Sequence, residues 1–294
     1  MEVKKLYESG DYLIVNKPYD MYINSDDENE KNTVTYHIAS PDSHLSTSFQ
    51  PLHFVQRLDY ATSGVLCIAK NKSAAGRAGK LFEKRLTKKY YLAVVRGHVE
   101  LDLADIEYDV GMDPSTADSS HRMVAVTPSS EACVLPRAAH TRLLLLETGY
   151  YGSDAVSVVL LKPITGRRHQ LRVHCSALRH TILGDYTYSG AADVAPHRMF
   201  LHATRFYWQL YYVSDDVHPE PVPLCPAPRA PPFPPSFHIK TPEPFFSDQK
   251  FASQWKSEQV VCKYKSEAEF MAACDVIDRS YVIGVRYKLF SCRE

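Results

Sequence analysis

Val55-Gln56-Arg57-Leu58-Asp59-Tyr60-Ala61-Thr62-Ser63-Gly64 is the stretch of this 294-residue chain that tells most about its fold and chemistry. Arg57 and Asp59 stand on either side of Leu58. Side chains alternate across an extended segment, so a Leu58 that points into the core leaves the arginine and the carboxylate on the opposite face. An ionised carboxylate beside buried apolar surface is costly unless it is paired. The spacing alone fits two interpretations: a surface ion pair beside a turn, which is the common case, or a catalytic carboxylate.

Three further segments carry recognisable patterns. Residues 13–18 read LIVNKP, a short apolar strand that ends in Lys-Pro. Residues 86–97 read LTKKYYLAVVRG, whose β-branched and aromatic residues predict a strand that ends at the glycine. Residues 161–174 read LKPITGRRHQLRVH, and residues 182–185 (ILGD) follow. Together with residues 55–64, and in this order, the segments resemble the motifs of the RluA-type pseudouridine synthase family over about residues 5 to 212.

The resemblance implies an α+β fold, the pseudouridine synthase fold, with a mixed, mainly antiparallel sheet, flanking helices and a central RNA-binding cleft. It also implies an enzyme that isomerises uridine in RNA to pseudouridine. That reaction breaks the bond between N1 of uracil and the ribose, rotates the base and rejoins it through C5. No redox step occurs, so we expect neither a metal nor another cofactor. The reaction needs a carboxylate in a pocket that excludes water.

The resemblance assigns roles to four residues. Asp59 matches the catalytic aspartate, and Arg172 matches the arginine that pairs with it. Tyr91 matches the tyrosine that stacks on the target base. Arg57 matches the arginine that enters the RNA where the flipped uridine leaves. The ordinary alternatives are a helix-face arginine in water for Arg172 and a core tyrosine on a strand for Tyr91.

Two neighbouring positions qualify this assignment. Gln56 stands where the family usually has histidine; its amide forms hydrogen bonds but cannot carry charge. We interpret it as a tuned supporting position, because the four matched residues are all retained. Tyr90 precedes Tyr91, and neighbours on a strand face opposite ways. Tyr90 is therefore expected in the core.

Basic residues gather around the motifs although the formal net charge is zero. Residues 77–91 hold six Lys or Arg and one Glu, and residues 162–180 hold five Lys or Arg, three His and no acidic residue. A solvated helix face is the ordinary interpretation, but the position beside the chemical motifs favours a groove that binds RNA phosphates. We expect Lys80, Lys84 and Lys88 to follow one helix edge if the helix reaches Lys88. The predicted RNA-binding residues are Arg57, Lys80, Lys84, Lys88, Arg167 and Arg168.

Patterning predicts the order of elements and domains. Strands are expected at residues 12–16, 65–69, 90–95, 143–146, 156–161 and 200–212, and helices at 71–85, from 165 onward and at 266–277. We assign no element to residues 112–139. Eleven of the nineteen prolines fall between Pro219 and Pro244, where missing backbone donors predict an extended spacer. We therefore expect a catalytic domain over residues 1–213, a Pro-rich linker over 214–244, and a C-terminal extension over 245–294, packed on the core and ending in a strand.

Composition restricts compartment and partners. Seven cysteines without Cys-x-x-Cys spacing argue against a disulfide framework or a zinc site. They fit a reducing compartment, the cytoplasm or alternatively the nucleus. No apolar run approaches the roughly 20 residues needed to cross a bilayer. We expect a monomer whose partner is RNA (tRNA, rRNA or mRNA), and the Pro-rich segment as a plain linker or as a ligand for an SH3- or WW-like protein.

Two functions fit these observations. The first is an active uridine-to-pseudouridine isomerase. The second is a non-catalytic RNA-binding or folding factor that keeps the synthase fold. Retention of Asp59 favours the first.

Overall fold

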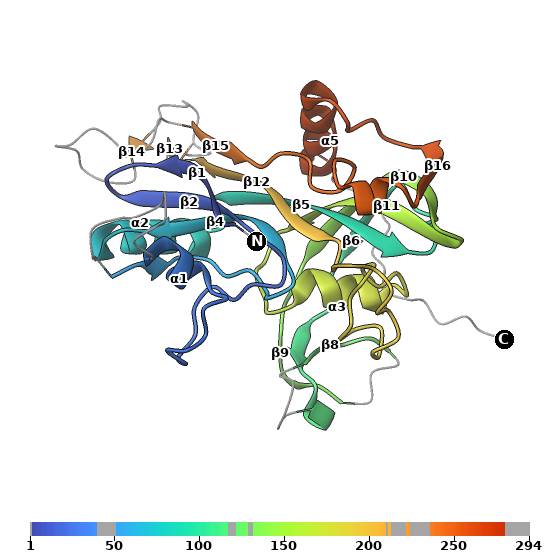
Figure 1. Cartoon of the computed structure of the whole chain (residues 1–294), viewed down its shortest axis with the longest axis horizontal. Helices are drawn as coiled ribbons and strands as arrows, with labels where there is room; N and C mark the ends of the chain where they lie inside the picture. The colour runs from blue at the N-terminus through green and yellow to red at the C-terminus, as the bar shows by residue number, and fades with distance from the viewer. Residues whose placement is uncertain are drawn as a thin grey trace. The chain divides into compact units, whose positions relative to one another are not determined.

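The computed structural model describes residues 2–39, 51–116, 122–128, 132–209, 211–212, 222–223 and 236–279 (Figure 1). The chain forms two compact units. Unit 1 contains Met1–Lys89 and Ala203–Pro242, and unit 2 contains Tyr90–His202 and Glu243–Glu294. Both boundaries fall inside strands, after Lys89 and before Ala203.

Unit 1 is built on a sheet with the strand order β1-β2-β4-β12-β15. The pairs β1–β2, β2–β4, β3–β4 and β12–β15 are antiparallel. All residues of β4 are buried, which explains its unbroken apolar sequence. The strands are β1 (Lys4–Glu8), β2 (Tyr12–Lys17), β3 (His53–Phe54), β4 (Ser63–Ala69), β12 (Leu201–Gln209) and β15 (Ser236–Lys240), with the short pair β13 (Tyr211–Tyr212) and β14 (Val222–Pro223) and the helix α1 (Val34–Ala39) beside them.

Helix α2 (Lys72–Glu83) covers this sheet. It begins after Asn71, whose side chain accepts a hydrogen bond from the Ala74 amide at 2.9 Å, the interaction expected of an N-cap. The apolar side of the helix packs on strand residues that include Tyr12 and Trp208, and the Tyr12 hydroxyl donates to the Ala74 carbonyl at 2.9 Å. The predicted helix at 71–85 is confirmed, with Arg85 already in the left-handed region (φ 58°).

Unit 2 is built on a second run of strands, β5-β11-β10-β16, with β6 also paired to β10. The pairs β5–β11, β11–β10 and β10–β16 are antiparallel. The strands are β5 (Thr87–Arg96), β6 (Leu103–Ile106), β10 (Thr141–Tyr151), β11 (Asp154–Pro163) and β16 (Trp255–Val260). A small sheet of order β8-β7-β9 lies in the same unit, from β7 (Val110–Met112), β8 (Met123–Ala125) and β9 (Val134–Arg137), with a 3-10 turn at Pro114–Thr116.

Helices cover both faces of the unit 2 strands. α3 (Gln170–Ala177) and α5 (Glu267–Arg279) lie on opposite sides of β10 and β11 (Figure 1). The chemistry of β10 agrees with this arrangement: Thr141 bonds to α3, whereas its neighbour Arg142 bonds to the end of α5. Successive strand residues point to opposite faces. The short helix α4 (Gln249–Ala252) precedes β16.

Mainly antiparallel strands with helices packed on them confirm the predicted α+β class. The strands predicted between residues 12 and 212 all have counterparts, and α5 confirms the helix expected near 266–277. The helix expected from residue 165 begins five residues later, at Gln170, because Thr165 and Arg167 are held in a turn by the Gln170 side chain. Residues 112–139, left unassigned, form most of the small sheet.

Among its described residues, the predicted linker contains two strands, β14 and β15. Ser236–Lys240 (β15) pairs with β12, so proline-free residues of the 214–244 stretch join a sheet where we expected a spacer. Most of the remaining linker, and the strand expected at the C-terminal end, fall outside the described residues, and the domain limits stay predictions. The part of the chain described here contains no helix long and apolar enough to span a membrane.

Candidate active site

The Asp59 segment follows the alternation predicted for it. Leu58 is buried (7% exposed), Arg57 is exposed and Asp59 is half-buried. The segment turns after Asp59, with the Thr62 amide donating to the Asp59 carbonyl at 3.1 Å. The turn leads directly into the fully buried strand β4. Asp59 is thus half-buried at the point where the chain enters the sheet.

Lys17 stabilises this turn through its buried side chain. Its side chain is fully buried, and Nζ donates to the carbonyl oxygens of Pro18 (2.9 Å), Met21 (2.7 Å) and Tyr60 (2.9 Å). A buried ammonium requires such partners, because desolvation without hydrogen bonds is costly. One bond reaches the residue next to Asp59, and the Met21 amide also donates to the Tyr60 carbonyl at 3.2 Å. The Lys-Pro pattern was visible in the sequence, but this contact was not.

Gln56 and Gly64 hold the other side of the segment. Gln56 Nε2 donates to the Val65 carbonyl at 3.0 Å, so the residue that replaces the family's histidine ties the segment to β4. Gly64 adopts φ 116°, and a Cβ there would lie 2.2 Å from the Ala203 carbonyl oxygen. Only glycine fits this conformation and this close approach between two strands of unit 1.

Arg172 lies on α3 with its guanidinium in a buried, bidentate ion pair. Nε donates to Asp185 Oδ2 at 2.7 Å and a terminal nitrogen donates to Oδ1 at 2.8 Å. Asp185 is 1% exposed and also accepts from the Tyr188 amide at 3.2 Å. The Tyr188 ring centre lies 4.9 Å from the guanidinium carbon, a cation–π distance. Arg172 is therefore not a helix-face arginine in water.

Asp185 was not among the predicted partners of Arg172. It lay in the ILGD segment that continues the third motif, which was the available signal. The predicted pairing of Arg172 with Asp59 joins residues of different units and stays a prediction.

A buried polar network fixes α3. Gln170 uses its whole amide: Oε1 accepts from the Thr165 hydroxyl (2.7 Å) and the Arg167 amide (2.9 Å), and Nε2 donates to Thr141 Oγ1 (2.9 Å) and the His140 carbonyl (3.0 Å). These bonds explain why a polar glutamine is buried at the first turn of the helix. They also locate the third motif against β10.

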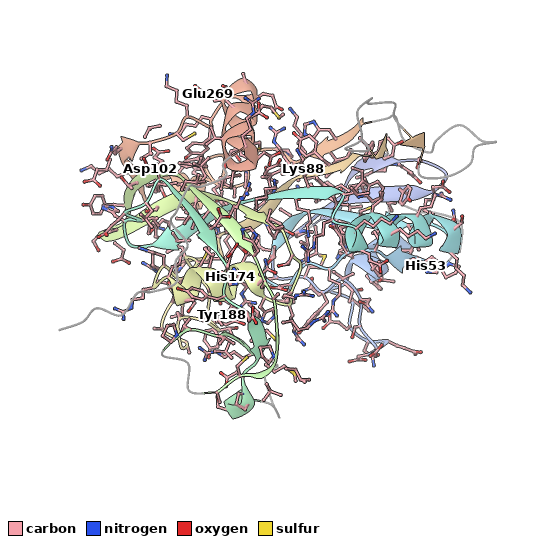
Figure 2. The ribbon with its side chains drawn as sticks, turned by 180° about the vertical axis from the view of Figure 1, so that it is seen from behind. His53, Lys88, Asp102, His174, Tyr188 and Glu269 are labelled. Carbon is pink, nitrogen blue, oxygen red and sulfur yellow. The ribbon has the colours of Figure 1, made fainter. Side chains whose placement is uncertain are left out.

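His174 continues this network between α3 and the strands (Figure 2). The ring is fully buried, with Nδ1 2.9 Å from Thr141 Oγ1 and Nε2 2.9 Å from the Tyr108 carbonyl. A carbonyl only accepts, so Nε2 carries the proton and Nδ1 accepts from the threonine hydroxyl. Burial lowers the pKa of His174 to about 4, so the ring is neutral at neutral pH. These contacts give His174 a structural role, since its ring joins α3 to Thr141 and Tyr108.

The two tyrosines of β5 differ as predicted. Tyr90 is buried (2% exposed), and its hydroxyl donates to Asp278 at 2.8 Å, which confirms it as a core residue. Tyr91 is half-buried and lies opposite Leu161 across the β5–β11 ladder.

The predicted RNA-binding residues are mostly exposed. Arg57, Lys80, Lys84, Lys88 and Arg168 all have exposed side chains. The helix does not reach Lys88, which was the condition for a row of three lysines on one helix edge: α2 ends at Glu83 with Lys84 as its C-cap, and Lys88 belongs to β5. Arg167 is half-buried, and its Nε donates to the Ala138 carbonyl at 2.9 Å.

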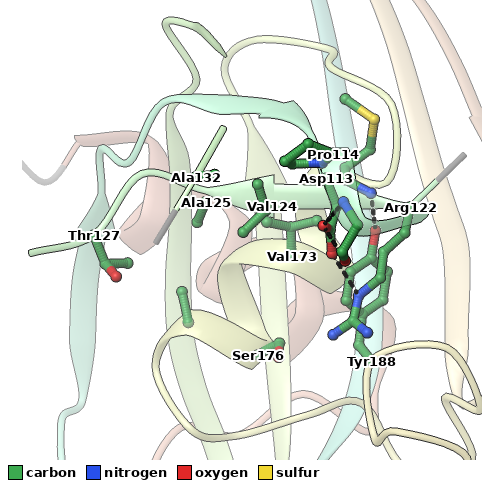
Figure 3. A pocket seen from close by; sticks show the side chains of 13 residues that line it. Asp113, Pro114, Arg122, Val124, Ala125, Thr127, Ala132, Val173, Ser176 and Tyr188 are labelled. Carbon is green, nitrogen blue, oxygen red and sulfur yellow. Dashed lines mark hydrogen bonds and ion pairs between the residues drawn. The ribbon is translucent and has the colours of Figure 1, made fainter. Parts of the chain in front are cut away.

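Unit 2 also contains a pocket that the sequence analysis missed (Figure 3). It has a volume of about 390 Å³ and lies between α3 and the small sheet, with Asp113, Arg122 and Tyr188 among its lining residues. The Tyr188 hydroxyl accepts from the Met123 amide at 3.1 Å and lies 3.0 Å from His169 Nδ1. No signal in the sequence predicted it, because residues 112–139 had been assigned no element. Among the described residues, no group of three or more His, Cys, Asp or Glu side chains is placed to hold a metal ion.

Comparison with known proteins identifies the family. The model of the RNA pseudouridylate synthase family matches residues 11–177. The chain belongs to this family. The matched span contains Asp59, Tyr91 and Arg172 and ends at the last residue of α3.

Relatives of the synthase include animal and bacterial proteins. It is 41% identical over 242 residues to RNA pseudouridylate synthase domain-containing protein 1 of Danio rerio (82% of this chain and 74% of the relative). It is 35% identical over 203 residues to the dual-specificity RNA pseudouridine synthase RluA of Escherichia coli K12 (67% and 83%). The solved structure of human RNA pseudouridylate synthase domain containing 1 has a TM-score of 0.69 at 32% identity and covers 93% of this chain and 95% of that one. These likenesses confirm the RluA-type resemblance and the predicted fold.

Proposed function

We propose that this protein converts uridine to pseudouridine in RNA and that Asp59 is its catalytic carboxylate. The observation that carries the proposal is the construction of the Asp59 turn. Lys17 and Gln56 hold its backbone at two points, whereas the Asp59 side chain is half-buried. A carboxylate that must attack a base or ribose, or take a proton, needs a fixed position together with access to the substrate.

We assign roles to three further residues from their exposure and charge. Tyr91 offers a half-buried amphipathic ring for stacking on the target base, a contact worth about 1–3 kcal/mol. Arg172 supplies a permanent positive charge that supports an ionised carboxylate during the reaction. Exposed Arg57 stands two residues before Asp59 and occupies the space in the RNA from which the uridine is flipped.

Substitution of Asp59 by asparagine tests this function. Asp59→Asn keeps the shape of the side chain and removes its charge, so RNA affinity and stability are expected to stay near those of the wild type. Product is expected to fall by about 10³-fold or more, because the reacting group is lost. Pseudouridine is measured by mass spectrometry of RNA from cells with and without the protein, and then with purified components.

Asp26→Asn is the matched control, since it removes one exposed carboxylate from a loop of the same unit. Turnover near the wild-type rate in Asp59→Asn would refute the assignment of Asp59. RNA binding by a wild-type protein that forms no pseudouridine in any cellular RNA would favour the non-catalytic factor instead.

We propose further that Lys80, Lys84 and Lys88 bind RNA phosphates. Replacing all three with glutamine should weaken binding about equally for all RNA sequences. The salt dependence should flatten by a slope of roughly 0.7 for each lost contact to a single strand. A triple glutamine variant at Lys250, Lys256 and Lys263 changes the net charge equally and serves as the control. If both triple variants keep the wild-type slope, Arg167 and Arg168 become the next residues to test.

The cytoplasmic monomer and the protein partner for the Pro-rich segment stay predictions. So does the class of RNA that is modified.

A further inference from the structure

Two hydrogen bonds of the same kind join the C-terminal segment of unit 2 to the strands β5 and β10. In each, a tyrosine hydroxyl donates to a carboxylate: Tyr90 to Asp278 at 2.8 Å, and Tyr264 to Glu147 at 2.6 Å. The first joins the end of α5 to β5. The second joins the residues that precede α5 to β10. Tyr90, Tyr264 and Glu147 are buried, and Asp278 is half-buried. Only the Tyr90–Asp278 bond involves β5, the strand that carries Tyr91.

Asp278 connects two neighbouring strands. Besides the Tyr90 hydroxyl, its Oδ1 accepts from Lys162 Nζ of β11 at 2.6 Å. Lys162 Nζ also lies 6.0 Å from the centre of the Tyr90 ring. The carboxylate, the ammonium and the phenol therefore form one compact group on the α5 face of the strands. Charge-assisted hydrogen bonds of this length are stronger than neutral ones.

Arg142 fixes the end of α5 on a third strand. Its Nη1 donates to the carbonyls of Ile277 (3.1 Å) and Asp278 (3.0 Å), and its Nε donates to Asp105 at 3.1 Å. A cation at a helix C-terminus satisfies free carbonyls and opposes the negative end of the helix dipole. The backbone of Asp278 is thus held independently of its side chain, which restricts where the carboxylate can lie.

The register of the strands connects this group to Tyr91. Tyr91 lies opposite Leu161 in the β5–β11 ladder. Tyr90 precedes Tyr91 on β5, and Lys162 follows Leu161 on β11. Asp278 therefore bonds to the neighbour of each paired residue. The Tyr91 side chain points to the opposite face from Tyr90. A displacement of β5 toward or away from α5 would therefore move the Tyr91 ring with it.

We propose that Asp278 is a positioning residue that sets the place of Tyr91 through Tyr90 and Lys162. The inference rests on the proposed function, in which Tyr91 stacks on the target base. It extends that function to a helix beyond residues 11–177, the span that the family model matches. On this proposal, the C-terminal extension contributes to catalysis because it positions Tyr91.

Single-turnover kinetics at saturating RNA test the proposal. Asp278→Asn weakens the link to Lys162, and Tyr90→Phe removes one hydroxyl. Both are expected to lower the rate constant by about 10- to 100-fold, the effect of a small misplacement of a substrate-positioning group. The dissociation constant for RNA should change less than threefold, because neither substituted side chain is proposed to contact the RNA. Rates are compared at a temperature at which circular dichroism shows every variant folded.

Tyr264→Phe is the matched control. It removes the same kind of bond from the same segment without touching β5, so its melting temperature should fall while its rate stays near that of the wild type. Equal rates in Tyr90→Phe, Asp278→Asn and Tyr264→Phe would overturn the positioning role, because the contacts would then act on stability alone. If Asp278→Asn fails to fold, Tyr90→Phe decides the question by itself. A wild-type protein without any product would instead overturn the proposed function.

Discussion

The Asp59 turn and the Arg172 cluster hold their charged groups in opposite ways. The Asp59 side chain is half-buried, and the bonds of Lys17 and Gln56 act on the backbone around it. Arg172 is buried, and its own charged atoms are bound by Asp185 in two hydrogen bonds. In the Asp59 turn, hydrogen bonds hold the backbone and the side chain is half-buried. In the Arg172 cluster, hydrogen bonds hold the charged side chain itself.

This difference follows from what each charge is proposed to do. A carboxylate that reacts must change its bonding during each turnover, and a half-buried side chain on a fixed backbone suits that role. An arginine that only supplies charge changes nothing, and a buried bidentate pair keeps its orientation constant. The two regions should therefore fail differently when they are perturbed.

Loss of the arginine should have the largest effect on folding. Arg172→Met leaves Asp185 buried without its partner, and the free energy of unfolding should fall by about 3–5 kcal/mol. Arg172→Lys keeps a charge but loses the planar guanidinium, so its stability should lie between those of the wild type and Arg172→Met. Activity should decrease in the same order: Arg, Lys, Met. Urea denaturation measures this. Arg168→Met on the exposed surface is the control, and equal stability of the two methionine variants would contradict the buried pair.

Acid should destabilise the protein through His174, which lies on the same helix as Arg172. The pKa of His174 is lowered from 6.5 to about 4 by burial, so the unfolded chain binds a proton on this residue at a higher pH than the folded protein does. The stability that the neutral ring contributes is complete above pH 6.5 and is lost as the pH falls toward 4, about 3 kcal/mol in all.

His174→Gln removes this proton uptake. Its unfolding free energy, measured in urea between pH 7 and pH 4, should fall less steeply than that of the wild type. Parallel pH profiles for the two proteins would mean that His174 titrates normally in the folded state.

Lys17 tests the frame around Asp59. Lys17→Met removes the Nζ donor from three carbonyls, of which only that of Tyr60 still accepts from the Met21 amide, and should cost about 2 kcal/mol. The effect should be local: hydrogen exchange at the Met21 amide, which donates to the Tyr60 carbonyl, should accelerate, and the single-turnover rate should fall. Lys4→Met on the exposed edge of β1 is the control. Unchanged exchange at Met21 would show that the turn does not depend on Lys17.

Gln56 should give the smallest effect. Gln56→Ala removes one neutral hydrogen bond to the Val65 carbonyl and should cost about 1 kcal/mol. Gln56→His introduces the residue usual in the family and, if its ring nitrogen reaches the same carbonyl, should restore part of the loss. Melting temperature and turnover are measured for both. A loss of activity in Gln56→Ala as large as in Asp59→Asn would mean that Gln56 takes part in the reaction.

Local patterns in the sequence predicted much of the fold. The apolar run of β4, the i, i+4 pattern of α2 and the β-branched residues of β5 each report on their own burial, because the periodicity of a strand or helix is written in adjacent residues. The same holds for the alternation that leaves Asp59 and Arg57 on one side of Leu58. Helix ends were less predictable: α2 stops before Lys88 and α3 starts at Gln170, where tertiary hydrogen bonds compete with helix formation.

The sequence by itself determined the family and the order of the elements, and it supplied the candidate residues for the chemistry, since these depend on residue type and spacing. Only the tertiary structure decided which partner each buried polar group takes. Arg172 pairs with Asp185, 13 residues away; Lys17 reaches the Tyr60 carbonyl across 43 residues; and Tyr90 meets Asp278 across 188. A buried donor must find an acceptor, but which one comes within 3 Å depends on how distant strands and helices pack. No local pattern records that distance.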